Sequence, residues 1–427
     1  MQGTDNDGED YVMVERPSES QSTPEASSSL SPAIASVDGD DDGDEDAYFF
    51  ATPHPPTPGV ADISPFSSRS DEEEMGDYYS PSLSPMSRHD HDQDDSPTSS
   101  FKARDSMVIH RKTKTSSGAY HANHLELIPD AKSESKWISM LNNWNLTIMF
   151  RSSALKRRLR RGIPPHLRPI AWYRLSDIAT LKTKFPDPQL IDVSQVSKQV
   201  LEDIEKDVDR TYPEHDLFTV EGSGQGALRN ILVWYAAVDP DVEYCQGMSF
   251  VAGLLLTYFT AEEAFYCFYH CLWNMGLRQM YLPGLVDLQR RLHVLTQLGW
   301  VHIEPLWQHL TDNHVDPMMY ATEWFMTLFC RGFDFALSTR VVEIFMFEGY
   351  KVIYRVALSI LMSMEAPLMA ADFEGILHII RNCNKNMNPA QIMQDSYTWN
   401  FRTADLTRHE NVYNKLQNEV MGGSKKR

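Results

Sequence analysis

Residues 244–261 read YCQGMSFVAGLLLTYFTA, the longest stretch of this 427-residue chain that is mostly apolar and carries no charge. The polar side chains of Gln246, Ser249, Thr257 and Thr260 interrupt it. A stretch of this length and mixed polarity is typical of a buried helix rather than of a membrane span. We therefore expect a buried helix here, the most apolar one of the chain.

The segments around it also have helical patterns. They are 195–210, 226–238, 261–275, 285–298, 320–333, 339–362 and 406–420. The alternation that indicates β-strands is hard to find, the turns between the segments are short, and no repeat of about 20 to 50 residues is visible. The sequence predicts an all-α fold, a compact multi-helix domain.

Order should begin near residues 136–144, KWISMLNNW, where large apolar residues recur at helical spacing. Residues 156–175 then read KRRLRRGIPPHLRPIAWYRL, in which a helix ends at Gly162 and a new one follows two prolines. The basic residues of the first helix are Lys156, Arg157, Arg158, Arg160 and Arg161. They could meet an acidic lipid or partner, or form a solvated face that complements the C-terminal dipole of the helix. We favour the solvated face.

The charge of the chain is concentrated at its N-terminus. Residues 1–100 hold 24 acidic and three basic side chains, a balance of 3 − 24 = −21, and the rest of the chain is close to neutral because the whole carries −20. Residues 1–130 are rich in Ser, Pro, Asp and Glu, so we expect them to be disordered. A neutral body with an acidic tail gives no reason to expect nucleic-acid binding.

Eight Ser-Pro or Thr-Pro pairs lie in this acidic region. A proline-directed kinase could phosphorylate them, or the composition alone could generate them, and the two interpretations carry equal weight.

The five cysteines form no CxxC pair, which favours a reduced, intracellular protein without a structural zinc site. The opening residues MQGTDNDGED contain no apolar leader, so we expect a cytoplasmic location.

The sequence contains none of the familiar motifs for nucleotide hydrolysis, zinc proteolysis or serine hydrolysis. The glycine-rich string EGSGQGAL, 221–228, lacks a P-loop lysine and is expected to be a flexible connector. Cys245 has no partner base that the sequence can assign, so a buried, unreactive thiol is the default.

Two short patterns have an open interpretation when taken alone. In IEKDVDRT, Asp207 and Arg210 are one helical turn apart, which fits an exposed surface ion pair worth about 0.2–0.5 kcal/mol. In EYCQGMSF, Gln246 and Gly247 precede the apolar helix, so the glutamine amide could point outward or could be a polar cap.

Taken together with GIPPHLRPIAW, these patterns resemble the three motifs of the TBC-domain GTPase-activating proteins of Rab-type small GTPases. The motif GIPxxxRxxxW is matched by Gly162, Ile163, Pro164, Arg168 and Trp172; IxxDxxRT by Ile204, Asp207, Arg210 and Thr211; and YxQGM by Tyr244, Gln246, Gly247 and Met248. The resemblance covers about residues 140 to 385. It departs from the family at Ser176, where a glycine is usual, and at Glu343, where an aspartate is usual.

The resemblance implies that Arg210 is an arginine finger and Gln246 a glutamine finger, both supplied in trans to the GTPase. It implies that Asp207 and Arg168 hold Arg210 extended and that Trp172 packs behind it. Ile204, Thr211, Tyr244, Gly247 and Met248 are the remaining supporting positions.

The implied partner is a Rab-type small GTPase in its GTP state, which brings GTP and Mg²⁺ with it, so that no cofactor or metal is expected to belong to this chain. The chain would then be a catalytic activator in vesicle trafficking, recruited to endomembranes. Two alternatives stay open: a TBC scaffold that binds a GTPase without catalysis, and a helical adaptor that binds membranes peripherally through an amphipathic basic helix with exposed aromatic residues.

The expected organisation follows from these observations. Residues 1–130 form the disordered acidic region, 131–385 the TBC domain, 386–420 C-terminal helices that pack on it, and 421–427 a basic tail.

Overall fold

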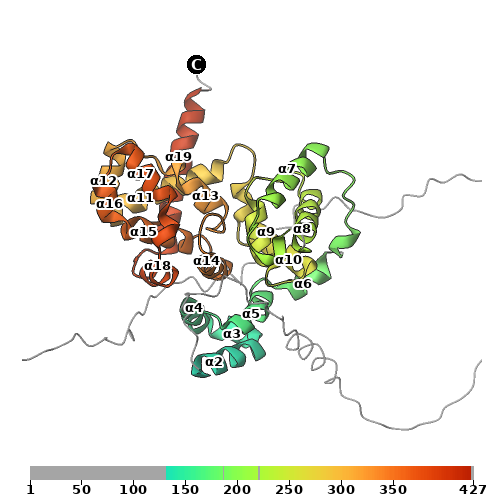
Figure 1. Ribbon diagram of the computed structural model, residues 1–427. Coiled ribbons are helices and arrows are strands. Elements are labelled where there is room, and N and C mark those ends of the chain that lie inside the picture. Colours follow the sequence, from blue (N-terminus) through green and yellow to red (C-terminus); the bar gives the residue numbers. More distant parts are fainter. Residues whose placement is uncertain (1–130, 186, 220–221, 425–427) are drawn as a thin grey trace, which may run out of the picture. The chain divides into compact units, whose positions relative to one another are not determined.

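The computed structural model describes residues 131–185, 187–219 and 222–424, and the predicted disorder of residues 1–130 lies outside these residues. The described part is helical and contains no β-strand, which confirms the all-α prediction (Figure 1). Short 3₁₀ and π turns join the α-helices. In chain order these helices are α2 (Ala131–Asn142), α3 (Trp144–Phe150), α4 (Ser152–Arg161), α5 (Arg168–Leu175), α6 (Ile178–Lys184), α7 (Lys198–Asp209), α8 (Gly224–Val238), α9 (Met248–Leu256), α10 (Ala261–Tyr269), α11 (Val286–His302), α12 (Glu304–Asp312), α13 (Ala321–Met326), α14 (Phe335–Glu348), α15 (Lys351–Ser363), α16 (Glu365–Met369), α17 (Phe373–Arg381), α18 (Pro389–Ser396) and α19 (Thr403–Ser424).

The predicted buried helix is α9, and every one of its residues is buried. It is enclosed by α7, α8 and α10, which all contact it. At Gly253 the helix comes so close to the end of the α7 segment that an added Cβ would lie 3.0 Å from Cγ2 of Thr211. Burial of this apolar helix stabilises the fold through the hydrophobic effect, and its packing holds α7 against α9.

The segment 131–175 folds as the sequence predicts. α4 ends at Gly162, which has φ 108°, and α5 begins after the two prolines. The indole of the fully buried Trp137 donates to the carbonyl of Gly162 at 3.0 Å, so α2 is tied to this turn. A glycine is needed here because other residues rarely adopt this φ.

The basic run of α4 is only partly the solvated face that we favoured. Arg157 and Arg161 are exposed, but the guanidinium of Arg160 makes a two-point ion pair with Glu348 at 2.8 and 2.9 Å. Burial acts to raise the pKa of Glu348, but the hydrogen bonds and charge of Arg160 outweigh it and hold that pKa below its usual range. The prediction failed for Arg160 because the end of α14, distant in sequence, brings a carboxylate to α4.

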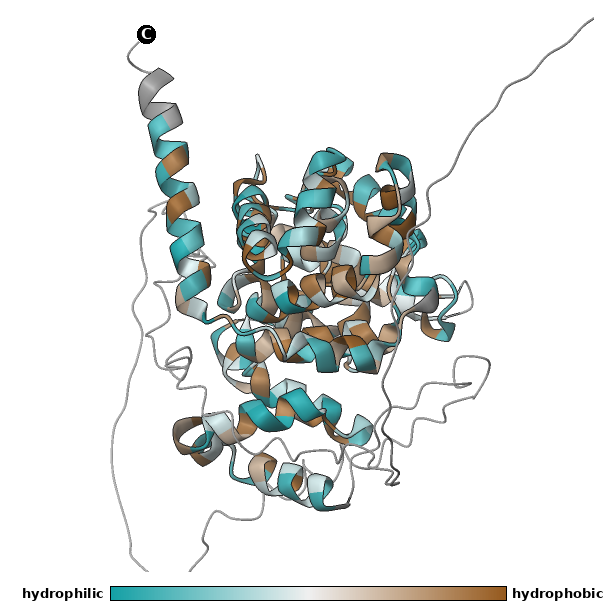
Figure 2. Ribbon diagram, turned by 90° about the vertical axis from the view of Figure 1, so that its left-hand side faces the viewer, coloured by the Kyte–Doolittle hydropathy of each residue, from teal (hydrophilic) through white to brown (hydrophobic). Residues whose placement is uncertain are grey.

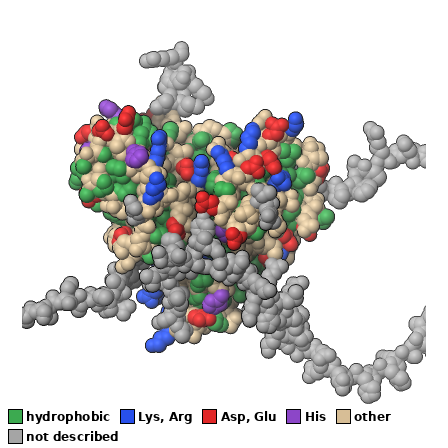
Figure 3. Space-filling view, viewed as in Figure 1, with side chains coloured by type: hydrophobic (Ala, Val, Ile, Leu, Met, Phe, Trp, Pro, Cys, Tyr) green, Lys and Arg blue, Asp and Glu red, His purple; other side chains and the backbone are tan. Residues whose placement is uncertain are grey.

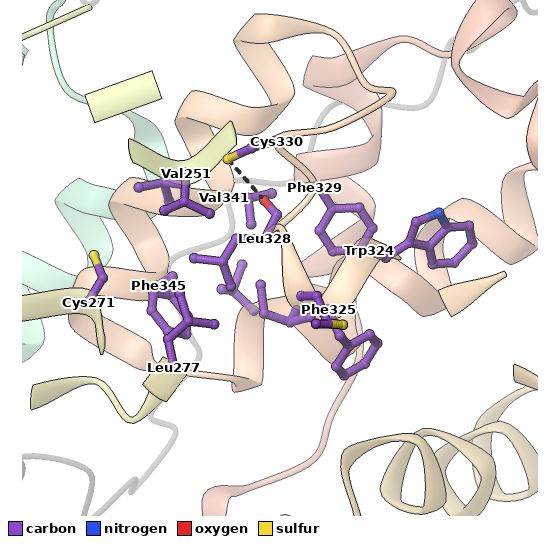
Figure 4. Close-up of a cluster of buried hydrophobic side chains, with 14 of the residues drawn as sticks. Val251, Cys271, Leu277, Trp324, Phe325, Leu328, Phe329, Cys330, Val341 and Phe345 are labelled. Atoms are coloured by element: carbon purple, nitrogen blue, oxygen red, sulfur yellow. Dashed lines mark hydrogen bonds between the residues drawn. The ribbon is translucent and has the colours of Figure 1, made fainter. Parts of the chain in front are cut away.

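Two of the predicted helices are shorter in the structure, because residues with positive φ interrupt them. The segment 339–362 is two helices, since Gly349, with φ 64° and ψ −149°, separates α14 from α15. The segment 320–333 is helical only to Met326, since Leu328 and Phe329 have φ 49° and 59°. Figure 4 shows both side chains inside a buried apolar cluster with residues of α9, α13 and α14, so tertiary packing outweighs local helix propensity at these positions.

The glycine-rich connector is also corrected. Its residue Gly224 is the buried first residue of α8, and a Cβ there would lie 2.3 Å from the carbonyl oxygen of Leu217. The glycines therefore permit close packing onto the preceding turn, where a flexible connector was expected.

The C-terminal helices pack on the domain at two places. α18 contacts α14 and α15, whereas α19 lies along α11. Figure 2 shows α19 extending toward the C-terminus with mostly hydrophilic residues on its surface. The helix runs to Ser424, into the segment 421–427 that was expected to be a tail. Among the described residues, no helix has the length and apolarity needed to cross a membrane.

Gly349→Ala should lower the free energy of unfolding by about 1–3 kcal/mol, because this backbone conformation is nearly restricted to glycine. The space is open, since nothing lies within 4 Å of the added Cβ. Gly226→Ala is the matched control: its Cβ would be equally unobstructed, but the residue is helical, so the change should be neutral or stabilise by up to about 1 kcal/mol. Urea unfolding of both variants measures the difference, and equal midpoints would contradict this account of the break between α14 and α15.

Candidate functional site

The second motif forms the end of α7. Ser197 caps the start of the helix, since its hydroxyl accepts from the backbone N–H of Val200 at 3.3 Å, and the helix ends at Asp209. Ile204 and Val208 are fully buried and fix the inner face of the helix. Arg210 is the first residue past the helix, with φ −102° and ψ 2°, and its side chain is 40% exposed.

Asp207 lies at the centre of the site. Its carboxylate is 2.5 Å from Nη2 of Arg210 and also accepts from two groups of a distant loop. The hydroxyl of Tyr244 donates to it at 2.5 Å, and the backbone N–H of Gly247 donates at 3.1 Å. One carboxylate therefore links the arginine of the second motif to the loop that carries Gln246.

The expectation of an exposed Asp207–Arg210 pair is wrong for the carboxylate. Asp207 is only 3% exposed, because the 244–247 loop covers it. Spacing within one helix indicates that two side chains can meet, but it carries no information on a loop that arrives from elsewhere. The loss of a partner therefore costs more free energy at this buried carboxylate with three donors than at a surface ion pair.

Thr211 ties the same region to α9. Its hydroxyl is fully buried, 2.6 Å from the carbonyl oxygen of Asp207 and 2.8 Å from the hydroxyl of Ser249. The next residue, Tyr212, has φ 48°, and its hydroxyl lies 2.8 Å from the carbonyl oxygen of Cys330. These hydrogen bonds stabilise a sharp turn of the chain directly after Arg210.

The third motif is a tight turn at the start of α9. Gly247 has φ 102°, and an added Cβ would lie 3.1 Å from Cγ2 of Thr327. Met248 is fully buried, and its sulfur accepts from the backbone N–H of Cys245 at 3.1 Å. With its neighbours fixed in this way, Gln246 is left exposed, as the outward-facing alternative for its amide requires.

Arg210 and Gln246 line the same hollow, which has a volume of about 330 Å³. The residues that line it are Asp203, Lys206, Asp207, Arg210, Tyr244 and Gln246. Basic and acidic side chains are mixed on the surface over α7, at the upper right of Figure 3. The guanidinium of Arg210 and the carboxamide of Gln246 thus both line a hollow that a docking partner could enter.

Asp203 and Lys206 are lining residues that the motif analysis missed. Their side chains pair at 2.9 Å. A signal for them exists in the sequence, since positions 203, 206, 207 and 210 follow the i, i+3, i+4, i+7 pattern of one helix face.

Arg168 and Trp172 have contacts outside this hollow. Nε of Arg168 donates to the fully buried Glu343 at 3.1 Å, and Nη2 donates to the carbonyl of Ile163 at 3.3 Å. The ring of Trp172 lies 4.7 Å from that of Tyr258. These contacts hold α5 to α14 and to the segment after α9, and the direct support of Arg210 that the resemblance implied for both residues stays a prediction.

The titratable groups of the loop stay protonated at neutral pH. Burial, together with the Asp207 carboxylate, raises the pKa of Tyr244, so its hydroxyl remains a hydrogen-bond donor. Burial and the same carboxylate raise the pKa of Cys245 to about 11. The thiol is thus a poor nucleophile, in line with the default interpretation. Within the described part of the chain, no group of three or more His, Cys, Asp or Glu side chains is arranged to hold a metal ion.

Asp207→Asn should lower the free energy of unfolding by about 3 kcal/mol, because it removes the buried charge and places an amide NH₂ against groups that themselves donate. Tyr244→Phe keeps the carboxylate and its pair with Arg210, so it should cost only about 1 kcal/mol. Urea unfolding at neutral pH compares the two. Wild-type stability of Asp207→Asn would mean that the carboxylate is exposed in solution.

Comparisons with known proteins agree on one family. The model of the Rab-GTPase-TBC domain matches residues 165–369. The human "Ecotropic viral integration site 5 protein homolog" is 29% identical over 314 residues, which cover 72% of this chain and 38% of that protein. The Caenorhabditis elegans "Rab GTPase-activating protein eat-17" is 33% identical over 243 residues, which cover 57% of this chain and 27% of that protein. The chain thus spans less than two-fifths of the length of either relative.

The fold has a counterpart among solved structures. The crystal structure of the Chlamydomonas flagellar RabGAP TBC domain aligns with a TM-score of 0.51 at 24% identity, and covers 62% of this chain and 92% of that one. The matched residues contain the end of α7, the 244–247 loop and the hollow between them. This chain therefore carries a domain that belongs to the Rab-GTPase-TBC family.

Proposed function

We propose that this chain accelerates GTP hydrolysis by a Rab-type small GTPase, with Arg210 and Gln246 entering the active site of the GTPase in trans. The observation that carries the proposal is the shared hollow, in which both side chains are exposed and Asp207 binds both segments that carry them. Membership of the Rab-GTPase-TBC family supports it, as does the name of the worm relative, a Rab GTPase-activating protein.

Arg210 supplies positive charge where the reaction develops negative charge. As water attacks the γ-phosphorus of GTP and GDP leaves, charge grows on the γ-phosphoryl and bridging oxygens. A guanidinium is charged at any working pH and donates through a planar fork that fits phosphate oxygens. Arginine fingers of this kind accelerate hydrolysis by about 10³- to 10⁵-fold.

Asp207 prepares this guanidinium for insertion. An arginine at a helix end samples many rotamers, and fixing it during docking would consume binding energy. The ion pair at 2.5 Å directs the side chain before the partner arrives. The preorganised direction lowers the cost of reaching the transition state.

Gln246 orients the attacking water in this proposal. Its amide can accept a hydrogen bond from the water and donate one to a γ-phosphoryl oxygen. The turn at Gly247 and the exposure of Gln246, which lines the hollow together with Arg210, support this role. The two fingers then act on the same phosphoryl group, one through charge and the other through position.

The GTPase brings GTP and Mg²⁺ to this complex, so the chain needs no cofactor of its own. We place the activity in the cytoplasm, at endomembranes where Rab-type GTPases direct vesicle trafficking. The partner recognised is the GTP-bound state, since only that state offers a γ-phosphate to the two fingers.

Arg210→Lys should lower stimulated hydrolysis by at least about 100-fold, because lysine keeps the charge but loses the planar fork. Arg229→Lys is the matched control, since Arg229 also pairs with a carboxylate of α7, Glu205, but lies outside the hollow. Single-turnover hydrolysis with a panel of GTP-loaded Rab-type GTPases measures both variants. Full activity of Arg210→Lys would show that Arg210 does not act as an arginine finger. Binding of the wild type to GTP-loaded partners without acceleration would identify a scaffold instead.

Gln246→Ala should slow stimulated hydrolysis by about 10- to 1,000-fold, the range for the loss of one positioned polar group in a transition state. The wild-type chain should still stimulate a GTPase whose own catalytic glutamine has been replaced, whereas Gln246→Ala should not. Gln308→Ala, at an exposed glutamine of α12, is the control. Unchanged rates of stimulated hydrolysis with Gln246→Ala would show that the GTPase itself positions the attacking water.

A further inference from the structure

The short helix α3 places its large apolar side chains outward. Leu146, Met149 and Phe150 are 57%, 69% and 73% exposed. They lie at positions i, i+3 and i+4, so they share one face of the helix. The polar Thr147 is buried instead, and its hydroxyl donates to the carbonyl of Met140 at 3.2 Å. Single exposed apolar residues are common on soluble proteins, whereas several on one helix face form a patch of the kind that binds partners or membranes.

The charged residues of this segment are all basic. Residues 144–161 contain six Lys or Arg and no Asp or Glu. Arg151 caps α3 directly after Phe150 and is exposed. Arg157 and Arg161 are exposed and one turn apart on α4, which contacts α3; both helices lie at the bottom of Figure 1.

This combination restricts the chemistry of the partner. The exposed apolar side chains of α3 fit an apolar layer, and the exposed arginines at its end and on the contacting helix α4 fit anions at the edge of that layer. The boundary between headgroups and acyl chains of an anionic bilayer supplies both within a few ångströms. Arginine also bends its charge toward phosphate while its stem stays in the apolar layer.

We propose that α3 and the exposed face of α4 form a docking surface for an anionic lipid bilayer. Leu146, Met149 and Phe150 enter the headgroup boundary, and the exposed arginines bind the lipid phosphates. The segment precedes residues 165–369, which the family model matches, and shares no residue with the hollow of Arg210. The proposal therefore adds a membrane contact to the proposed function and does not depend on it.

A second anionic occupant is the chain's own acidic region, residues 1–100, with its balance of 3 − 24 = −21. Its carboxylates could pair with the arginines, but a chain rich in Ser, Pro, Asp and Glu offers no continuous apolar layer to the three side chains of α3. The bilayer satisfies both halves of the surface, and the test includes the acidic region as an outcome.

The test uses the full chain and vesicles. Phosphatidylcholine vesicles with and without phosphatidylserine are pelleted with the protein at low and high salt. We expect binding only to the vesicles that contain phosphatidylserine, and weaker binding at high salt because salt screens the arginine–phosphate attraction.

Two double variants separate the two halves of the surface. Met149→Ser with Phe150→Ser removes apolar insertion, and Arg157→Glu with Arg161→Glu reverses charge. Each should lower the partition coefficient by at least about 10-fold. Leu190→Ser and Lys198→Glu, at positions where the whole residue or its side chain is 78% and 91% exposed, are matched controls and should bind like the wild type. Stimulated hydrolysis of a soluble GTPase and circular dichroism verify that each variant is folded.

Wild-type chain that stays in solution with both kinds of vesicle overturns the proposal. So does a Met149→Ser, Phe150→Ser variant that binds as well as the wild type. A photo-crosslinking residue in place of Leu146 then identifies the occupant: crosslinks to residues 1–100 would assign the surface to the chain's own acidic region.

Discussion

A carboxylate removed from water must find hydrogen-bond donors, and Asp207 finds them on two segments that are 37 to 40 residues apart in sequence. Arg210 comes from the end of its own helix, whereas Tyr244 and Gly247 come from the loop before α9. Because one charge serves both, the direction of Arg210 and the position of Gln246 are set together. Loss of either segment would leave a buried charge short of partners, so the two motifs form as one unit.

The apolar core provides the platform for this unit. α9 is buried along its whole length, so the chain must pass from the exposed Gln246 into the core in the turn before the helix. The left-handed backbone at Gly247 makes that change of direction within one residue. Gln246 is therefore positioned by how α9 packs rather than by contacts of its own side chain. An exposed amide placed by a rigid core remains available to a partner.

Much of this could be predicted from the sequence, because it depends on local patterns. Helical periodicity predicts the fold class, the apolar stretch predicts α9, and the glycine and prolines predict the turn at Gly162. The failures depend on contacts between distant segments. The burial of Asp207 and the ion pair of Arg160 with Glu348 each require a second element that arrives from far along the chain. Gly349 divides two helices through its backbone conformation, which helical periodicity alone does not reveal.

The raised pKa of Cys245 has a consequence for how the site moves. Its thiol sits next to Gln246, and because burial and the Asp207 charge keep it protonated, it hardly reacts while the loop is closed. Cys245 is partly buried, and its reaction with an alkylating agent becomes faster whenever the loop leaves Asp207, because burial and the nearby negative charge no longer raise the pKa of the thiol. The alkylation rate of Cys245 is therefore sensitive to any opening of the segment that carries Gln246.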